Sequence, residues 1–248
     1  MPATPAWPPQ SSPRLFVPGP LSESASVRIE SQQAHYLRNV MRLGEGDAVI
    51  LCDDLTGEWA ASIVAAGKRD IALGCAKLLR PREQVPDFVL CAALLKKQRF
   101  DLVLEKATEL GVRRIQPVLT SRAVADKLNL IRARAIVVEA AEQCARTALP
   151  ELAPPATLPM LLRTWPTSRL LFFADEHGGA PALAAFAGAR GLPAALLTGP
   201  EGGFDAAERT AILALSQARA ITLGPRILRG ETAVIAASAL WMGAAGDW

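Results

Sequence analysis

The chain has 248 residues, of which half are hydrophobic and about a fifth are charged, and its formal net charge is +3. This length fits one large domain or two smaller ones, and the composition is that of a globular protein with enough apolar side chains for a core. Four cysteines without a CxxC motif and only two histidines argue against a disulfide framework and a His/Cys metal cluster, and they predict buried thiols in a reducing cytosol.

Residues 1–13 are rich in proline and contain neither a basic residue nor an apolar stretch. This composition predicts a disordered or extended lead-in and not a secretion signal. The longest apolar helix candidate, Thr232 to Ala245, is too short to span a bilayer. We therefore expect a soluble, cytoplasmic protein.

Short alternating stretches typical of strands follow in residues 14–78, at 14–17, 26–29, 48–52, 58–64 and 70–76. One helix is expected among them, with Ser31 as its N-cap. Its apolar residues at helical spacing are Ala34, Leu37, Val40 and Met41. Several short strands around one helix predict a small β-barrel at 14–78, and two prolines among charged residues at 79–86 predict a linker.

From residue 87 the pattern changes to strands that alternate with helices. Phe88 to Leu95 is a continuous apolar run, which is typical of a strand buried on both faces, and Arg99 to Leu110 has the single apolar face of a helix. Further strands are expected at 114–118, 170–174, 194–198 and 220–223, and further helices at 130–144, 180–186, 205–218 and 231–245. This alternation predicts an α/β domain at 87–248 with a mostly parallel sheet, in which ligands bind beyond the carboxyl ends of the strands.

Positive charge is concentrated in the middle of the chain, where Lys77 to Arg134 contains 13 Lys and Arg against 6 Asp and Glu. A basic segment in a nearly neutral protein suits a polyanionic partner. A solvated surface around a strand and a helix explains the same charges, and composition alone favours this second interpretation.

A glycine-containing loop, TGPEGGF at 198–204, follows the strand expected at 194–198 and precedes Asp205, a plausible N-cap. The loop is neither a GxGxxG fingerprint nor a Walker loop, and the carboxylate of Glu201 would repel a phosphate. A cationic or neutral ligand of the adenosine type fits better. Glycine content alone is equally consistent with a tight strand–helix turn.

A second loop, LGPRILRGETA at 223–233, opens the most apolar helix of the chain. A helix that is apolar all round is buried in a core or against a partner subunit. Arg226 and Arg229 precede this helix, and two buried arginines are expensive unless they contact an anion or carboxylates. The alternative is a structural pair with Glu201 or Glu231.

The two loops together resemble the signature of the RsmE-type ribosomal RNA (uracil-N(3)) methyltransferases, which belong to the SPOUT class. The resemblance extends to three upstream segments: LEKATELGV at 104–112 with IQP at 115–117, EAAEQCAR at 139–146, and HYLRNVMRL at 35–43 before Gly46-Asp47. Three details depart from the family, since Cys144 stands where a small serine is commoner, the proline-rich tail at 1–13 is extra, and SRAVADK at 121–127 matches only loosely.

The resemblance implies a C-terminal SPOUT domain at 87–248 whose deep trefoil knot holds S-adenosyl-L-methionine, and a PUA-like β-barrel at 14–78 that helps to recognise RNA. It also implies a homodimer with active sites near the subunit interface. The implied activity needs no metal and methylates N(3) of one uridine in 16S ribosomal RNA, either free or within the assembled 30S small subunit. Two alternatives stay open: a SPOUT methyltransferase acting on another RNA position, and a non-catalytic RNA-binding module, which the intact loops disfavour.

The resemblance further implies roles for single residues. Contacts to the cofactor are expected from Leu197, Thr198, Gly199, Glu201, Gly202, Leu223, Gly224, Ile227, Leu228, Arg229, Thr232 and Ala233. From charge type and loop position, Arg229 is expected to stabilise charge on the uracil oxygens, and Glu201 is expected to act as a base or to contact the cofactor. N(3) lies on the pairing edge, so the target base must be flipped out or unpaired.

Basic residues outside the pocket are expected to hold the flanking RNA strand: Arg14, Arg38, Arg42, Lys96, Lys97, Arg99, Arg122 and Arg146. His35 matches a position of the family, but a structural role in capping or packing its helix is favoured. His177, before two glycines, is expected to mark a loop.

Overall fold

The computed structural model of the chain describes residues 8 and 11–248. The chain forms two compact units, which we call unit 1 (residues 1–84 and 141–148) and unit 2 (residues 85–140 and 149–248). Most of the lead-in expected at 1–13 lies outside the described residues. Among the residues that are described, no helix combines the length and the apolar character that crossing a membrane requires.

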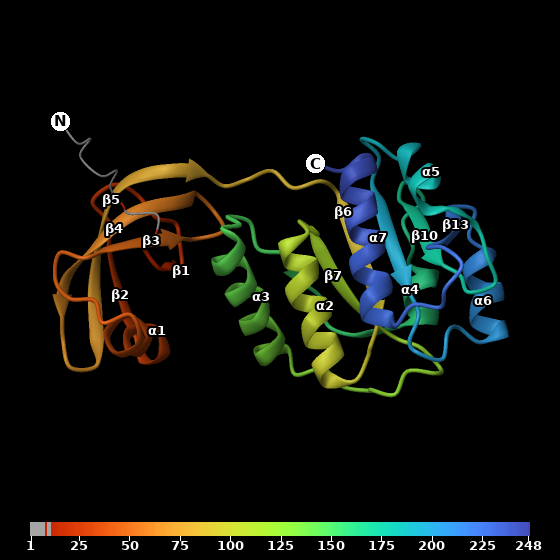
Figure 1. Ribbon diagram of the computed structural model, residues 1–248, viewed down its shortest axis with the longest axis horizontal. Coiled ribbons are helices and arrows are strands. Elements are labelled where there is room, and N and C mark those ends of the chain that lie inside the picture. The colour runs from red at the N-terminus through yellow and green to blue at the C-terminus, as the bar shows by residue number, and fades with distance from the viewer. Residues whose placement is uncertain (1–7, 9–10) are drawn as a thin grey trace. The chain divides into compact units, whose positions relative to one another are not determined.

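Unit 1 contains a curled sheet with the strand order β1-β3-β4-β5-β2 (Figure 1). Its strands are β1 (Arg14–Phe16), β2 (Ser26–Glu30), β3 (Ala48–Cys52), β4 (Gly57–Ala66) and β5 (Asp70–Pro81). Side chains from all of these strands share one core, in which Leu51, Ile63 and Leu73 are buried. Shifts of register between β4 and β5 bend both strands, which curls the sheet. The expected β-barrel is therefore confirmed in the form of a half-barrel.

The helix expected in unit 1 is shorter and less regular than its apolar spacing suggests. α1 (Ser31–His35) continues directly into a π-helical turn, η1 (Tyr36–Val40), and the N-cap is Glu30 instead of Ser31. A π turn widens the spacing between residues on one face, so the i, i+3, i+4 pattern no longer holds. Leu37 is buried as expected, but the side chain of Val40 is 60% exposed.

The boundary expected near residue 87 differs from the observed units in two places. β5 continues to Pro81 because Arg80 pairs with Glu58 of β4, so the expected linker at 79–86 begins within a strand. Residues 141–148, which include the last turn of α3 (Leu130–Cys144), are grouped with unit 1. There Phe16 N donates to Glu142 Oε1 at 2.7 Å and Thr147 N donates to Glu83 Oε1 at 3.0 Å, which fastens this segment to unit 1.

Three of the four cysteines are buried as expected, namely Cys52, Cys75 and Cys91. Burial raises the pKa of the Cys52 and Cys91 thiols to about 12, so both are inert at neutral pH. Cys144 is exposed, which corrects the expectation of a buried thiol at that position.

Unit 2 is built on a parallel sheet with the strand order β11-β13-β10-β12-β6-β7-β8, in which β9 also pairs with β7. The strands are β6 (Phe88–Ala93), β7 (Arg114–Leu119), β8 (Glu151–Leu152), β9 (Ala156–Thr157), β10 (Leu170–Ala174), β11 (Ala180–Pro181), β12 (Ala194–Thr198) and β13 (Ala218–Thr222). The helices are α2 (Lys97–Glu109), most of α3, α4 (Leu158–Arg163), α5 (Ala182–Ala187), α6 (Ala206–Leu213) and α7 (Gly230–Ala245). The expected α/β fold with a parallel sheet is confirmed.

Both faces of this sheet are covered, as the continuous apolar runs in its strands require. On one face, side chains such as Leu90 and Leu196 pack with α2, α5 and α7. On the other face, Cys91 and Leu197 pack with α4 and α6. α6 ends at Leu213 and not at 218, because Ala218 already pairs with Leu171 in the sheet.

Candidate functional site

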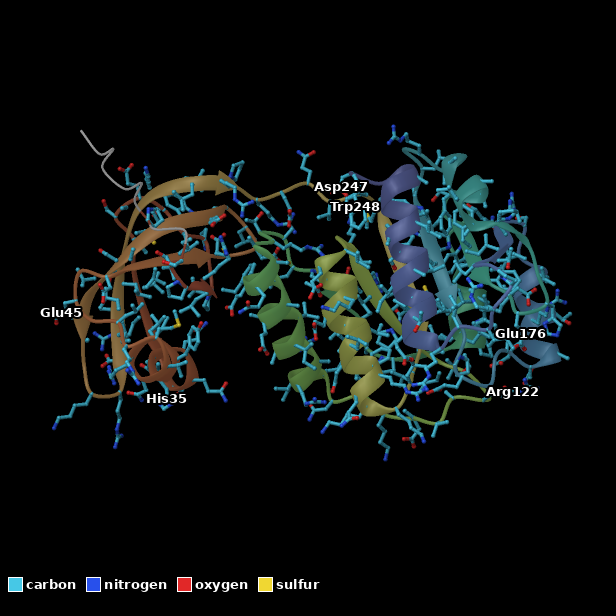
Figure 2. The ribbon with its side chains drawn as sticks, in the orientation of Figure 1. His35, Glu45, Arg122, Glu176, Asp247 and Trp248 are labelled. Atoms are coloured by element: carbon cyan, nitrogen blue, oxygen red, sulfur yellow. The ribbon has the colours of Figure 1, made fainter. Side chains whose placement is uncertain are left out.

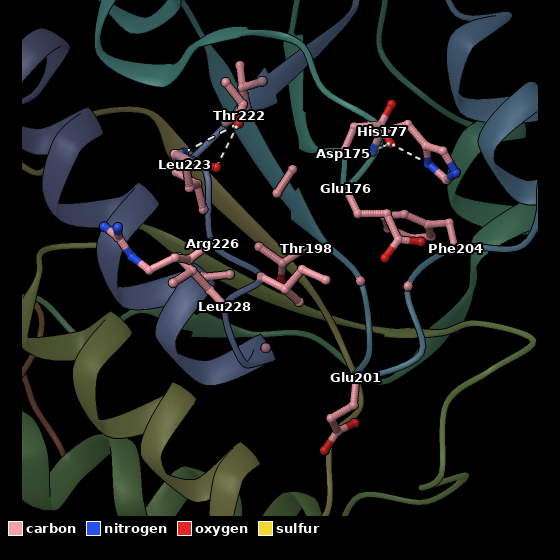
Figure 3. A pocket seen from close by; sticks show the side chains of 18 of the residues that line it. Asp175, Glu176, His177, Thr198, Glu201, Phe204, Thr222, Leu223, Arg226 and Leu228 are labelled. Carbon is pink, nitrogen blue, oxygen red and sulfur yellow. Dashed lines mark hydrogen bonds and ion pairs between the residues drawn. The ribbon is translucent and has the colours of Figure 1, made fainter.

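A pocket lies beyond the carboxyl ends of β13, β10 and β12, which are consecutive neighbours in the sheet of unit 2. Loops that follow these strands form its walls: 175–177 after β10, 199–204 after β12 and 223–228 after β13 (Figure 3). Gly230 and Ala233 from the first turns of α7 complete the lining. This is the edge at which parallel α/β sheets bind ligands, because the loops there converge on one point.

Two glycines allow the loops to take this shape. Gly203 has a φ of +67°, a left-handed conformation that favours glycine, and it lies next to the carboxylate of Glu176 from the β10 loop. Gly224 has a φ of +112°. Its backbone N–H donates to Thr222 Oγ1 at 3.3 Å, which closes the turn directly after β13.

One wall of the pocket carries negative charge. Asp175 is 8% exposed, and its carboxylate forms an ion pair with Arg209 Nε at 2.9 Å and contacts His177 Nδ1 at 3.3 Å. Glu176 is exposed and lies beside Phe204 on the same side of the pocket (Figure 3). Glu201 lies in the loop that follows β12. The whole lining holds three carboxylates and two arginines, Arg209 and Arg226, and Glu201 is paired with Arg99 outside the lining. Asp175 and Glu176 against Arg209 leave this wall one excess negative charge, which suits a cationic ligand and not a polyphosphate.

The opposite wall is mostly apolar, with Arg226 as its charged residue. Leu223 and Leu228 lie across the pocket from Glu176 and Phe204 (Figure 3), and Ile227 lines the pocket while 89% exposed. An isoleucine in contact with solvent on a pocket wall offers apolar surface that a flat heterocycle can cover. A nucleoside with a positively charged tail, which is the chemistry of S-adenosyl-L-methionine, therefore fits the residues present.

Most of the expected cofactor residues line this pocket: Thr198, Gly199, Glu201, Leu223, Gly224, Ile227, Leu228 and Ala233. The remaining four are outside its lining. Leu197 is fully buried because alternate side chains of β12 face the α4 and α6 layer. Gly202 instead faces Arg122, while Arg229 is the N-cap residue of α7 and Thr232 is exposed on its first turn.

Sequence reasoning missed the β10 loop, which contributes Asp175, Glu176 and His177 to the pocket. A signal was present, because three polar residues directly follow a strand that was itself expected from its apolar run. The same rule that selected the other two loops applies to this one, since all three strands are parallel. Phe204, in the segment that joins β12 to α6, and Arg209, in the first turns of α6, were also missed.

The charges before α7 differ from expectation. Arg226 and Arg229 are both exposed, so they carry no burial cost, whereas Glu231 is 8% exposed. Arg99 contacts the two carboxylates expected to pair with those arginines, through Nη1 to Glu201 Oε1 at 3.0 Å and through Nε to Glu231 Oε1 at 3.8 Å. α7 packs on α2 and α5, but Leu240 on its other side is 37% exposed.

Two of the expected RNA contacts are structural. Arg14 forms an ion pair with Glu58 at 2.7 Å and its side chain is 19% exposed. Arg146 is 5% exposed and contacts Glu83 at 3.5 Å. Burial lowers the pKa of the Arg146 guanidinium and the carboxylate of Glu83 opposes this shift. Both guanidinium groups are engaged with carboxylates of unit 1, which does not favour contacts with RNA.

The other expected RNA contacts are accessible. Arg38 donates to the backbone carbonyls of Lys68 and Asp70, and Arg42 is exposed in unit 1. Lys96 and Lys97 are exposed at the start of α2. Arg122 donates to Gly202 O at 2.8 Å and lies at the same end of unit 2 as Glu176 (Figure 2).

His35 is exposed in unit 1 (Figure 2), where its Nδ1 lies 2.7 Å from the side-chain amide of Asn39. This contact joins α1 to the π-helical turn. Metal chemistry has no evident location, since residues 8 and 11–248 contain no group of three or more His, Cys, Asp or Glu placed to hold an ion.

Sequence profiles of two known domains match the chain. The profile of an RNA methyltransferase domain matches residues 82–242, and that of an RNA methyltransferase PUA domain matches residues 29–73. The ribosomal RNA small subunit methyltransferase E of Synechocystis is 34% identical over 229 residues, which cover 89% of this chain and 74% of the relative. The protein of the same name from Rickettsia conorii is 28% identical over 229 residues, covering 91% and 93%.

Solved structures resemble the chain over nearly its whole length. A ribosomal RNA small subunit methyltransferase E from Neisseria gonorrhoeae, bound to S-adenosyl methionine, superposes with a TM-score of 0.83 at 27% identity, covering 96% of this chain and 99% of that one. A Legionella pneumophila protein described as a methyltransferase, in complex with the cofactor SAM, gives a TM-score of 0.86 at 27% identity over the same shares.

Proposed function

The chain belongs to the ribosomal RNA small subunit methyltransferase E family, and from this premise we propose that it transfers a methyl group from S-adenosyl-L-methionine to N(3) of one uridine in 16S ribosomal RNA. The observation that carries the proposal is the pocket itself. Three strand-end loops set an acidic wall opposite an exposed apolar wall, which suits a cationic nucleoside.

Each wall has a part in holding the cofactor. The apolar side chains of Leu223, Ile227 and Leu228 cover the adenine, and the carboxylates of Asp175 and Glu176 face the positive charges of the methionine part. Backbone groups of Gly199 and Gly224 complete the contacts. When bound, the cofactor supplies an electrophilic methyl group on a positively charged sulfur. Fixing donor and acceptor in attack geometry lowers the barrier by several kcal/mol, up to roughly 7–11.

The acceptor must lose a proton, because the uracil N(3)–H is a weakly acidic imide. Arg229 stands between the pocket-lining residues Leu228 and Gly230 and is exposed, so a flipped base can reach it. We assign it the stabilisation of negative charge on the uracil oxygens. Glu201 at the rim has two possible parts, as proton acceptor or as a contact to the cofactor.

The same proposal includes the RNA contacts, the knot and the oligomeric state. Arg38 and Arg42 in unit 1, with Lys96, Lys97 and Arg122 in unit 2, hold the RNA strand that flanks the target, whereas Arg99 is committed to Glu201 and Glu231. Threading of the loops at 199–204 and 223–228 forms a trefoil knot around the cofactor. A second copy of the chain covers the partly exposed apolar side of α7, giving a homodimer in the cytoplasm that acts on free 16S RNA or on the assembled 30S subunit.

One assay tests the central claim. The protein is incubated with methyl-labelled S-adenosyl-L-methionine and either free 16S RNA or assembled small subunits, and modified positions are mapped by reverse transcription. A methyl on N(3) blocks base pairing, so label should coincide with one arrest site at a uridine. Label without arrest would assign a different atom, and no label on either substrate would favour a non-catalytic RNA-binding protein.

A further inference from the structure

A charged cluster lies beside the pocket, on the β6 side of the β12 loop. It contains Arg99 from the first turn of α2, Glu201 from the β12 loop and Glu231 from the first turn of α7. Arg99 Nη1 lies 3.0 Å from Glu201 Oε1, and Arg99 Nε lies 3.8 Å from Glu231 Oε1. One guanidinium between two carboxylates leaves one excess negative charge in this cluster.

Close packing of α2 and α7 brings these side chains together. α2 begins directly after β6, and a Cβ on Gly230 would lie 2.9 Å from Leu95 Cδ2 and 3.5 Å from Gly199 O. A larger residue at 230 would displace the buried side chain of Leu95, which follows β6, whereas the contact with Gly199 O would be ordinary, so glycine allows α7 to start this close to Leu95. The next residue, Glu231, is thereby carried against Arg99.

The two carboxylates differ in what they can do. The Glu231 side chain is 11% exposed, and its Oε2 is buried without a hydrogen-bond partner among the described residues. A carboxylate in this position requires a cation, and Arg99 with the N-terminal end of α7 supplies positive charge. Glu231 is thus out of reach of a ligand, and its effect must pass through Arg99.

Glu201, in contrast, is accessible. Its side chain is 27% exposed, only its Oε1 is held by Arg99, and Figure 3 shows the carboxylate directed away from the interior of the pocket. This orientation does not suit a contact with the cofactor walls. It presents Oε2 at the rim, where a base arriving from outside meets the pocket.

We propose that Glu201 Oε2 accepts the N(3) proton of the acceptor uracil, that Arg99 is a positioning residue which fixes the orientation of this carboxylate, and that Glu231 positions Arg99. This inference rests on the proposed function. The N(3)–H bond breaks, its electron pair stays on the ring and forms the new N–C bond, and the proton forms an O–H bond on Glu201. The C–S bond breaks with its pair going to sulfur, and the proton on Glu201 passes to water afterwards.

The first test is Glu201→Gln, which keeps an oxygen for Arg99 but removes the proton acceptor. We expect kcat to fall by about 10²-fold or more, because general-base catalysis contributes 10²–10⁴. Affinity for S-adenosylhomocysteine by calorimetry and affinity for RNA should stay within a factor of two to three, about the level of a surface substitution. A kcat within threefold of the native value, or an equal loss of cofactor affinity, would overturn the assignment.

The second test separates positioning from structure. Arg99→Ala should lower kcat by about 10- to 100-fold, the cost of a misplaced catalytic group, with little change in KM. Free guanidinium added to this variant should restore part of the turnover, and Glu231→Gln should add no further loss to it, since Glu231 acts through Arg99. Additive losses without rescue, or a parallel fall in RNA affinity, would contradict a positioning role.

A matched control is available on the same helix. Asp101 of α2 also holds an arginine, Arg132, at 2.6 Å, with a partly exposed carboxylate. Asp101→Asn should leave kcat, KM and cofactor affinity unchanged. The proposed function is judged separately by the native protein, because absence of methyl transfer to N(3) there would refute that function. Unchanged kcat in Glu201→Gln beside an active native protein would refute only the inference.

Discussion

Each unit of the molecule contains a cluster of three charged side chains, and the two clusters have opposite composition. In unit 1 one carboxylate, Glu58, is clamped by Arg14 and Arg80, whereas in unit 2 one guanidinium, Arg99, lies between Glu201 and Glu231. Both oxygens of Glu58 are occupied and its side chain is 5% exposed. Arg99 occupies only one oxygen of Glu201, which is the most exposed carboxylate of the two clusters.

This difference separates a structural group from a chemical one. A carboxylate with both oxygens engaged and no contact with solvent can contribute only to stability, since nothing can reach it. A carboxylate that is fixed at one oxygen and open at the other is already oriented and still reactive. Four substitutions test whether this difference holds.

The largest effect is expected from Glu58→Gln. Removing the charge leaves Arg14 and Arg80 facing each other in the half-barrel without a counter-charge, so the free energy of unfolding should fall by about 3–5 kcal/mol. Urea unfolding monitored by circular dichroism measures this free energy. Arg28→Ala is the control, because Arg28 forms an exposed pair with Asp70 and its loss should cost about 1 kcal/mol or less. Equal losses of unfolding free energy in the two variants would show that engaging both oxygens of Glu58 adds no stability beyond that of an exposed ion pair.

Asp53 is a second carboxylate whose two oxygens both accept hydrogen bonds, and it should make the stability of unit 1 depend on acid. Burial raises the pKa of Asp53, but hydrogen bonds from the backbone N–H groups of Leu21, Gly57 and Thr56 outweigh it and lower the pKa below the ordinary value of 3.8. A lowered folded-state pKa gives stability that is present above about pH 4 and is lost as the pH falls further. Asp53→Asn should flatten this decline in urea midpoints below pH 4, and an unchanged decline would contradict it.

Asp53→Asn should also destabilise the fold at pH 7, by about 1–3 kcal/mol, because the amide cannot accept all the hydrogen bonds that the carboxylate accepts. Asp205 is a useful comparison. Hydrogen bonds, first from the backbone N–H of Glu208 and then from Ser121, lower its pKa too, but Asp205 is only half-buried, so the corresponding Asn variant should show a weaker effect of acid.

Glu176→Gln extends the contrast to the opposite wall of the pocket. Removing a carboxylate that faces a cationic ligand should weaken binding of S-adenosyl-L-methionine about tenfold, roughly the effect of one nearby unit charge under surface screening. S-adenosylhomocysteine lacks the sulfonium charge, so its affinity should change less. Calorimetry with both ligands decides the point, and equal changes for the two would mean that Glu176 does not sense that charge.

The smallest effect is expected from Arg42→Gln in unit 1. If Arg42 contacts one RNA phosphate, affinity should fall a few-fold and the slope of log affinity against log salt should change by about 0.7. Arg14→Gln differs, because Arg14 is committed to Glu58 and its loss should lower stability and leave the salt slope unchanged. A changed slope for Arg14 or none for Arg42 would reverse the distinction drawn between them.

The sequence predicts the elements of unit 2 well because its central strands β6, β10 and β12 are buried on both faces. The helix at 130–144 and the strands at 170–174 and 194–198 have the expected bounds, since an apolar run between polar turns leaves little freedom. The π-helical turn at 36–40 was not predictable from spacing, because the same apolar residues fit a regular helix. Short elements such as α4 carry too few residues to show a period.

The site was predictable in its two glycine loops and less so in its charges. The loop glycines are needed by the local backbone conformation, as the positive φ at Gly203 and Gly224 shows. Charge partners depend on long-range placement: nothing near residue 99 announces a contact with residues 201 and 231, more than 100 positions away. For the same reason Arg146 looks like a surface arginine in the sequence, although it is 5% exposed.

Unit 1 consists of two separate stretches of the chain, and this affects how it folds during synthesis. Residues 1–84 leave the ribosome without the segment at 141–148, which supplies Glu142 and Thr147 to the strands and loop of that unit. The half-barrel is complete only after the first strands and helices of unit 2 have also been synthesised. A truncated product that ends at residue 84 therefore lacks part of its own fold, and the two units cannot be separated by a single cut in the gene.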